Sequence, residues 1–128
     1  MTQVVAAIIE REGRVLICRR RESDPHPLKW EFPGGKVEPG EAPAAALARE
    51  LREELDIGAA IGAEVERYAF AYPEKKPILL TFYRVAEFDR EPRNVVFAEI
   101  RWEPVSRLPD FDFLEGDVEF VRRLAAGA

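Results

Sequence analysis

The chain has 128 residues, of which 47% are hydrophobic and 34% charged, and its formal net charge is −5. This balance is typical of a folded chain rather than a disordered one, and the length suits a single domain over residues 1–128. No apolar run reaches the roughly 20 residues of a membrane span, and no basic segment marks a secretory signal. Cys18 is alone, which excludes an internal disulfide and fits a reducing compartment, so we expect a cytoplasmic protein.

The net charge of −5 argues against one class of partner, the nucleic-acid polymer. Proteins that bind such polymers nonspecifically need a basic face that displaces counterions from the phosphates. An acidic protein still binds a polyphosphate when metal ions supply the positive charge. We therefore expect a small anionic ligand held together with a metal ion, and neither a nucleic acid nor a membrane as partner.

The first third of the chain reads as strands and loops. Hydrophobic patterning predicts two strands, at residues 3–9 and 14–19, around a polar turn. Two prolines break residues 22–29 into a loop, and a short strand at 30–32 follows. That strand is expected to stop at the Pro-Gly-Gly turn of residues 33–35.

A helix is expected next, over Ala42–Leu55. Apolar residues recur there at spacings of three and four, and Pro43 suits a first helical turn because its missing N–H costs nothing there. The residues expected on the core-facing stripe are Ala44, Leu47, Ala48, Leu51 and Leu55.

The rest of the chain predicts three strands and a final helix. The strands are expected at about residues 63–72, 77–88 and 96–103. The helix is expected from Phe113 or Leu114 to Ala125, begun by a capping box of Asp112 and Glu115. Its core-facing residues would be Leu114, Val118, Val121, and Leu124 or Phe120. This order of elements indicates an α/β or α+β fold with a mixed β-sheet between helices.

The first helix carries three carboxylates, Glu50, Glu53 and Glu54, within an arc of about 100°. The plain interpretation is a solvated charged face, which is what most charged helical runs are. Two features favour a metal site instead. Like charges at Glu50 and Glu54 repel, and the turn at Gly34 and Gly35 lets a backbone carbonyl approach the same ion. Hard oxygen ligands without cysteine or paired histidine select Mg²⁺ or Mn²⁺ over Zn²⁺.

The stretch from Gly35 to Ile57 resembles the Nudix box, and the preceding WEFPGGK resembles the approach to the box in its MutT-like branch. Asp56 stands where the family pattern has Gly. Since Asp is among the few other residues that adopt the left-handed conformation, we expect this departure to be tolerated. The matching positions are Gly35, Glu41, Arg49, Glu50, Leu51, Glu53, Glu54 and Ile57.

The resemblance implies an α/β/α sandwich, a single Nudix domain, and a metal site formed by a loop, a helix and a loop. Its metal ligands would be Glu50, Glu53, Glu54 and the carbonyl of Gly35, with Mg²⁺ as the cofactor and Mn²⁺ as an alternative. The catalytic residues would be Glu50, Glu53 and Arg49, where Glu50 takes a proton from the attacking water and Arg49 orients it. Structural roles in the motif would fall to Gly34 and Glu41.

The reaction implied is hydrolysis of a phosphoanhydride in a nucleoside diphosphate linked to a further group. The favoured substrate is a (deoxy)nucleoside triphosphate, cleaved to a nucleoside monophosphate and pyrophosphate. One alternative is a hydrolase of ADP-ribose or dinucleotide polyphosphates, whose members often carry an extra N-terminal dimerisation segment. Another is a Nudix module that binds nucleotides without catalysis, which has no need for the three carboxylates. A monomer or a homodimer is expected.

Four residues are candidates for substrate binding by the same resemblance, namely Arg20, Phe32, Lys36 and Glu115. Arg20 lies twelve residues before Phe32, a spacing at which MutT-like enzymes place a nucleotide-contacting arginine. Glu115 lies roughly where the hydrolases of oxidised guanine nucleotides place a base-reading asparagine. Glutamate accepts hydrogen bonds where asparagine both donates and accepts, so a preference for oxidised guanine is not predicted. Further candidates for the base pocket are Asp112, Asp117, His26, Phe70, Tyr72, Phe82 and Tyr83.

One acidic position of the MutT-like pattern is missing. Relatives often carry a further glutamate six residues before the tryptophan of the last strand, where this chain has Val96 before Trp102. Glu99 alternates to the opposite face of a simple strand and is a weak substitute. The chain is thus expected to use the three helix carboxylates alone or with another acid such as Glu38.

Overall fold

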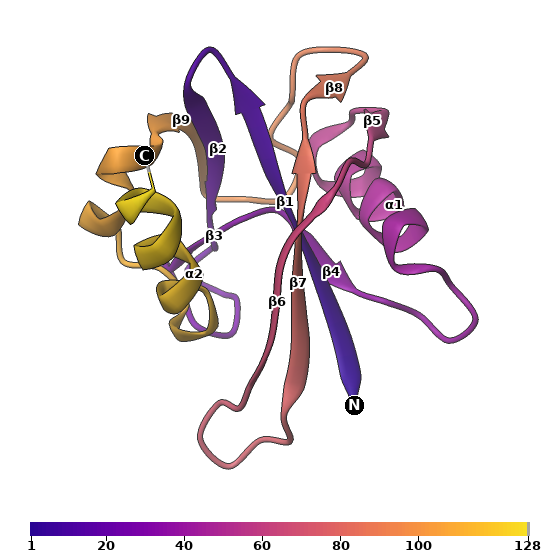
Figure 1. Ribbon diagram of the computed structural model, residues 1–128, viewed down its shortest axis with the longest axis vertical. Helices are drawn as coiled ribbons and strands as arrows, with labels where there is room; N and C mark the ends of the chain where they lie inside the picture. Colours follow the sequence, from indigo (N-terminus) through magenta and orange to yellow (C-terminus); the bar gives the residue numbers. More distant parts are fainter. Residues whose placement is uncertain (128) are drawn as a thin grey trace.

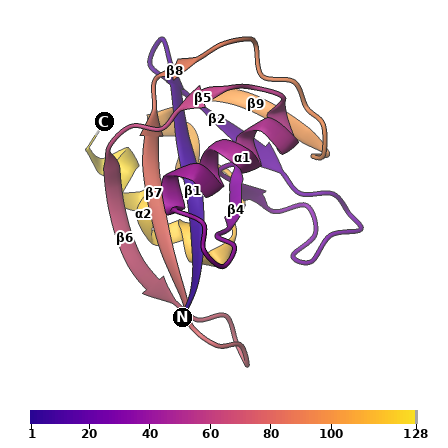
Figure 2. The same cartoon turned by 90° about the vertical axis from the view of Figure 1, so that its right-hand side faces the viewer.

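The computed structural model describes residues 1–127 and consists of a mixed β-sheet with one long helix on each side (Figure 1). Helix α1 spans Pro43–Leu55 and helix α2 spans Glu115–Ala126. Figure 2 looks onto the face of the sheet that α1 covers. The expected arrangement of a mixed sheet between helices is therefore confirmed. Among the described residues, no helix is both long and apolar enough to span a membrane.

Strand β1 (Thr2–Arg11) is the centre of the sheet, whose strands follow the order β3-β2-β1-β7-β6. It pairs in parallel with β7 on one side, and on the other it is antiparallel first to β4 and then to β2. The remaining strand bounds are β2 (Arg14–Arg19), β3 (Trp30–Glu31), β4 (Gly34–Lys36), β6 (Glu64–Phe70), β7 (Ile78–Val85) and β9 (Glu99–Pro104), with β5 (Ala59–Ala60) and β8 (Glu87–Phe88) forming a separate pair.

Alternation along β1 divides the core into two halves. Val5, Ala7 and Ile9 belong to the cluster under α1, while Ala6 and Ile8 belong to the cluster under α2. A strand that is covered on both faces has no solvent-facing side on which polar residues would alternate, which explains the continuous apolar run near the start of the sequence. The same strand therefore supports both helices.

Helix α1 starts one residue after its predicted start and ends where predicted. Its buried face holds Ala46, Leu47, Leu51 and Leu55. The prediction of Ala44 on this face is wrong, because that residue lies in the exposed first turn and Ala46 takes the place in the core. The left-handed conformation expected for Asp56 is confirmed, since this residue ends the helix with φ 55° and ψ 42°.

Gly34 and Gly35 form strand β4 rather than the predicted turn. Gly34 pairs with Ala6 and Gly35 with Val5 in the antiparallel ladder to β1. A Cβ atom on Gly34 would lie 1.9 Å from the carbonyl oxygen of Val5. Glycine has little intrinsic preference for strands, so a local pattern does not indicate this element. The strand exists because only a bare backbone fits so close to β1.

The predicted strand at 77–88 is divided, since the chain leaves β7 after Val85 and pairs as β8 with the short strand β5. A 3₁₀ helix at Val105–Asp110, which the patterning does not predict, leads from β9 towards α2. The pairing of β5 with β8 does not follow from hydrophobic periodicity, because the two strands are far apart in the chain.

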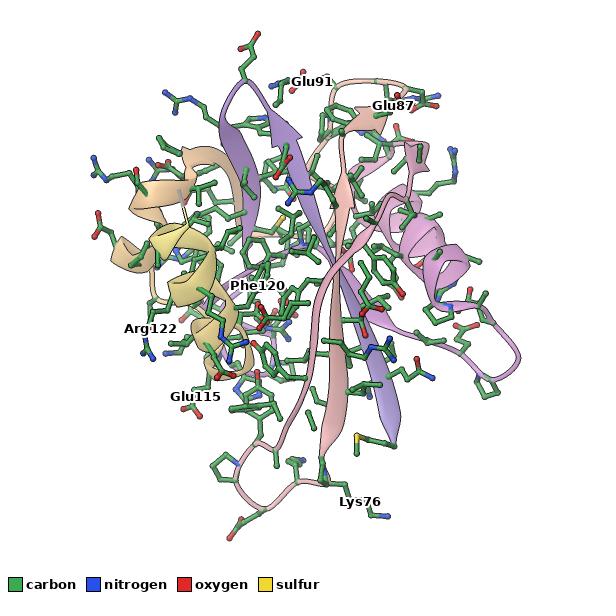
Figure 3. The ribbon with its side chains drawn as sticks, in the orientation of Figure 1. Lys76, Glu87, Glu91, Glu115, Phe120 and Arg122 are labelled. Atoms are coloured by element: carbon green, nitrogen blue, oxygen red, sulfur yellow. The ribbon has the colours of Figure 1, made fainter. Side chains whose placement is uncertain are left out.

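The start of α2 differs from the prediction of a capping box. Leu114 is the N-cap residue and makes no side-chain cap. Asp112 instead accepts a hydrogen bond from Lys29 at 2.8 Å. Val118, predicted to face the core, is 38% exposed, whereas Phe120 points from α2 into the core (Figure 3) and stacks on Phe82 with ring centroids 4.0 Å apart.

Replacing Gly34 by alanine is expected to lower the free energy of unfolding by about 3 kcal/mol, because the new methyl would collide with the backbone of β1. Gly13→Ala is the matched control. Gly13 has φ +78° but open space around it, so only the left-handed conformation is penalised there, at about 1 kcal/mol. Urea denaturation of both variants measures the difference, and equal losses would contradict the close approach.

Candidate functional site

One cavity of about 250 Å³ brings together residues that are far apart in the sequence. Its lining comes from β1, β3, β4 and β7, from the loops after β2, β3 and β6, from the C-terminal end of α1 and from the N-terminal end of α2. The polar residues that line it are Arg20, His26, Glu31, Lys36, Glu54, Tyr72 and Asp117. The predicted substrate residues Arg20, Phe32 and Lys36 are among the lining residues, and so are Gly34 and Gly35.

Glu50 and Glu54 form a carboxylate pair beside strand β4. Glu54 lines the cavity and accepts a hydrogen bond from the N–H of Gly34 at 3.2 Å. Burial, together with the charge of Glu50 and a hydrogen bond with it, raises the pKa of Glu54 to about 9. A Cβ atom on Gly35 would lie 2.5 Å from the carboxyl carbon of Glu50. Glycine at this position therefore makes the space in which Glu50 lies.

Arg49 connects the acids of the helix to the loop before it. Its guanidinium donates hydrogen bonds to Glu41 at 2.8 and 3.0 Å, to Glu50 at 3.0 Å and to Glu53 at 3.4 Å. A further bond at 3.3 Å reaches the carbonyl oxygen of Lys36. The hydrogen bond from Arg49 holds the pKa of Glu41 below its usual value. This one cation thus restrains three carboxylates and the end of β4.

The three helix carboxylates do not converge equally. Among residues 1–127, no three His, Cys, Asp or Glu side chains are arranged so that they could hold a metal ion. The Glu53 side chain is 58% exposed and is bonded to Arg49. Glu50 and Glu54 nevertheless lie together beside the backbone of Gly35, and their oxygens are hard ligands whose adjacent charges attract a cation. These residues fit a divalent ion in the chemistry of their donor set.

A second acidic group lies in the same cavity. Glu31 is paired with Arg20 at 3.0 Å, and burial raises the pKa of Glu31. Asp117 is buried with 6% exposure. Burial, together with the charge of Glu31, raises the pKa of Asp117 to about 8. Glu31 is not among the site residues predicted from the sequence, although a charged residue between two aromatic residues in Trp-Glu-Phe is a signal for it.

Aromatic residues complete the cavity. The rings of His26 and Tyr72 lie 4.8 Å apart, and the Tyr72 hydroxyl accepts a hydrogen bond from the N–H of Gly116 at 3.1 Å. Phe32 lines the same space. Glu115 does not line it, because this residue is exposed and points outward from the start of α2 (Figure 3). The other aromatic candidates, Phe70, Phe82 and Tyr83, do not line it either.

The alternatives for the missing acid lie away from the cavity. Val96 is 39% exposed in the segment between β8 and β9. Glu99 lies on β9 in register with Arg19 of β2. Glu38 is 67% exposed at 3.8 Å from Arg49. None of the three lines the cavity, where Glu31 is the acid that accompanies Glu54 and Asp117.

Comparisons with known proteins agree on one family. The chain matches the NUDIX domain family over residues 1–124. It is 40% identical over 124 residues to the 8-oxo-dGTP diphosphatase of Haemophilus influenzae, covering 95% of this chain and 90% of that enzyme. A match to the CTP pyrophosphohydrolase of Escherichia coli is 54% identical over 65 residues and spans only 51% of this chain and 48% of that enzyme. The solution structure of the E. coli ORF135 protein superposes with a TM-score of 0.88 at 33% identity, covering 98% of this chain and 89% of that one.

The raised pKa of Asp117 predicts a pH-dependent stability. Because the folded pKa of about 8 lies above the ordinary 3.8 of aspartate, the protonated carboxyl stabilises the folded chain. This contribution is complete below about pH 4 and is lost as the pH rises through about 8. Asp117→Asn removes the titration, so its stability relative to the wild type should rise between those limits and then level off.

Urea denaturation of both proteins across that range measures this difference. Glu115→Gln, an exposed neighbour on the same turn of α2, is the control and should show no such trend. A constant difference between Asp117→Asn and the wild type at every pH would refute the buried, protonated state of Asp117.

Proposed function

Since the chain belongs to the NUDIX domain family and is a hydrolase that acts on nucleotides, we propose that its substrate is a (deoxy)nucleoside triphosphate. Hydrolysis of the phosphoanhydride would give a nucleoside monophosphate and pyrophosphate, with Mg²⁺ as the metal. The observation that carries this proposal is the shared cavity, in which Glu54 beside Gly34 and Asp117 beside Phe32 line one space. A phosphate chain and a base can thus be bound together.

The end of the cavity that would hold the metal ion is the one beside α1. Glu50, Glu54 and the carbonyl of Gly35 would hold a divalent ion, and Glu53 would join them as a ligand. When bound, such an ion neutralises phosphate charge and lowers the pKa of a water molecule. Lys36, at the end of β4 and in the cavity, suits contact with phosphate oxygens.

The catalytic role of Glu50 is to accept the proton of the attacking water. The hydrogen bond from Arg49 at 3.0 Å keeps the Glu50 carboxylate in a single orientation. Glu41 in turn holds Arg49 through two hydrogen bonds. Arg49 and Glu41 are therefore positioning residues in this proposal, and the proton transfer belongs to Glu50.

The base end favours nucleobases that carry an amino group. Glu31 and Asp117 each retain an acceptor oxygen in either protonation state, and an exocyclic amine offers them hydrogen-bond donors. Thymine and uracil present carbonyl oxygens at the corresponding positions. The bases named for the two enzyme relatives, 8-oxoguanine and cytosine, both carry such an amine. Asp117, rather than the exposed Glu115, is the proposed base contact on α2.

The cytoplasmic location, the single domain and the monomeric or homodimeric state stay predictions from the sequence. So does the absence of a nucleic-acid polymer or a membrane as partner.

A substrate panel tests the proposed function. Normal and oxidised dNTPs, NTPs, ADP-ribose and a dinucleotide polyphosphate are incubated with Mg²⁺, and monophosphate and pyrophosphate are quantified separately. We expect pyrophosphate release, with cytosine and guanine nucleotides turned over about tenfold faster than thymine and uracil nucleotides. Faster turnover of ADP-ribose would replace the proposed substrate class. Nucleotide binding without any turnover would show a binding module instead of an enzyme.

Glu53→Gln is expected to lower kcat by about a hundredfold or more, because the amide cannot replace a carboxylate ligand. The melting temperature should hardly change, since the side chain is exposed. Glu119→Gln, on the outer face of α2, is the control and should retain the wild-type rate. An unchanged rate for Glu53→Gln would remove this residue from the metal site.

A further inference from the structure

Asp56 is an unfavourable residue for its place in the fold. It ends α1 with φ 55°, a conformation that glycine adopts at no steric cost. Its carboxylate also faces the negative end of the helix dipole. Glycine would avoid both penalties but has no side chain with which to make a compensating interaction.

Two arginines provide that interaction. Nη1 of Arg90 lies 3.7 Å and Nη2 of Arg93 lies 3.6 Å from Oδ2 of Asp56. Both arginines belong to residues 89–98, which connect β8 to β9. Their positive charges interact favourably both with the Asp56 carboxylate and with the negative end of the helix dipole. The Asp56 side chain therefore links the end of α1 to a segment that begins more than thirty residues later.

The same segment closes the end of the helix through its backbone. The N–H of Arg93 donates to the carbonyl oxygen of Leu55 at 2.8 Å, and the N–H of Val95 donates to that of Glu54 at 3.1 Å. These carbonyls are among the last four of α1, which have no partner within the helix. Glu54 is thus held at its backbone by this segment while its carboxyl group lines the cavity.

Both ends of the segment are fixed independently of Asp56. Asp89 exchanges two hydrogen bonds with Gly58, at 2.7 and 3.1 Å. Asn94 makes two bonds to the backbone of Phe97, whose side chain is buried in the core under α1. Between the contacts to Gly58 and to Phe97, the ion pairs of Arg90 and Arg93 with Asp56 add to the two backbone hydrogen bonds that Arg93 and Val95 make to the end of α1.

We infer that Asp56 is a positioning residue, which with Arg90 and Arg93 fastens residues 89–98 to the end of α1 and so fixes Glu54 in the cavity. For its effect on hydrolysis this inference rests on the proposed function. The ion pairs are solvent-exposed and contribute little to global stability. Their effect is therefore local: they order the end of α1 and hardly change the free energy of folding.

The test compares three variants. Asp56→Gly keeps the left-handed helix end and removes the carboxylate, Asp56→Asn keeps the shape and removes the charge, and Arg90→Gln with Arg93→Gln removes both partners. Each should lower kcat about fivefold with KM changed less than twofold, and amide hydrogen exchange at Val95 should become about tenfold faster. The melting temperature of Asp56→Gly should stay equal or rise, because strain is relieved. Arg90→Lys with Arg93→Lys should restore most of the rate.

The outcomes separate this inference from the proposed function. Wild-type kcat and wild-type exchange at Val95 in Asp56→Gly would overturn the inference, and so would a loss of rate that only follows a lower melting temperature. A protein that hydrolyses no nucleotide, yet shows faster exchange at Val95 in Asp56→Gly, would refute the proposed function and retain the fastening of the helix end. Arg107→Gln, which removes a pair to Asp110 elsewhere, is the control.

Discussion

The site depends on two glycines that bring the backbone of β4 against its neighbours. Gly34 lies where any side chain would meet the carbonyl of Val5, and Gly35 lies where any side chain would meet Glu50. These contacts hold β4 between β1 and α1. The N–H of Gly34 thereby reaches Glu54, and the carboxylate pair lies at the wall of the cavity. A side chain at either position would separate the sheet from the acids.

The second constraint is electrostatic. Three carboxyl groups line the cavity, those of Glu31, Glu54 and Asp117, against two cations, Arg20 and Lys36. Glu54 and Asp117 meet this excess by raised pKa values, which burial causes in both. Such a cavity is poorly suited to a bare anion and well suited to a polyphosphate that arrives with metal ions. The net charge of −5 of the whole chain likewise favours an anionic ligand that is bound together with metal ions.

Local patterns predicted several parts of this structure correctly. The amphipathic spacing defined α1 to within one residue, and the conformational freedom of aspartate explained Asp56. Predictions failed where a residue found a distant partner. Asp112 was expected to cap α2, but Lys29 lies beside it across 83 residues of sequence. Strand β4 was read as a turn, because glycine carries no sign of the strand that it pairs with.

By itself, the sequence determined the helix with Glu50, Glu53 and Glu54, the glycine pair before it, and the resemblance to the Nudix family. All of these are local in the chain, and so is the set of hard oxygen ligands that the helix offers to a metal ion. The tertiary structure alone decided which acids share the cavity. Glu31 from β3 and Asp117 from α2 join Glu54 there, while the Glu53 side chain stays exposed and pairs with Arg49. Burial and charge pairing depend on contacts between residues that are far apart in the sequence, so they arise only when the sheet and both helices have packed together.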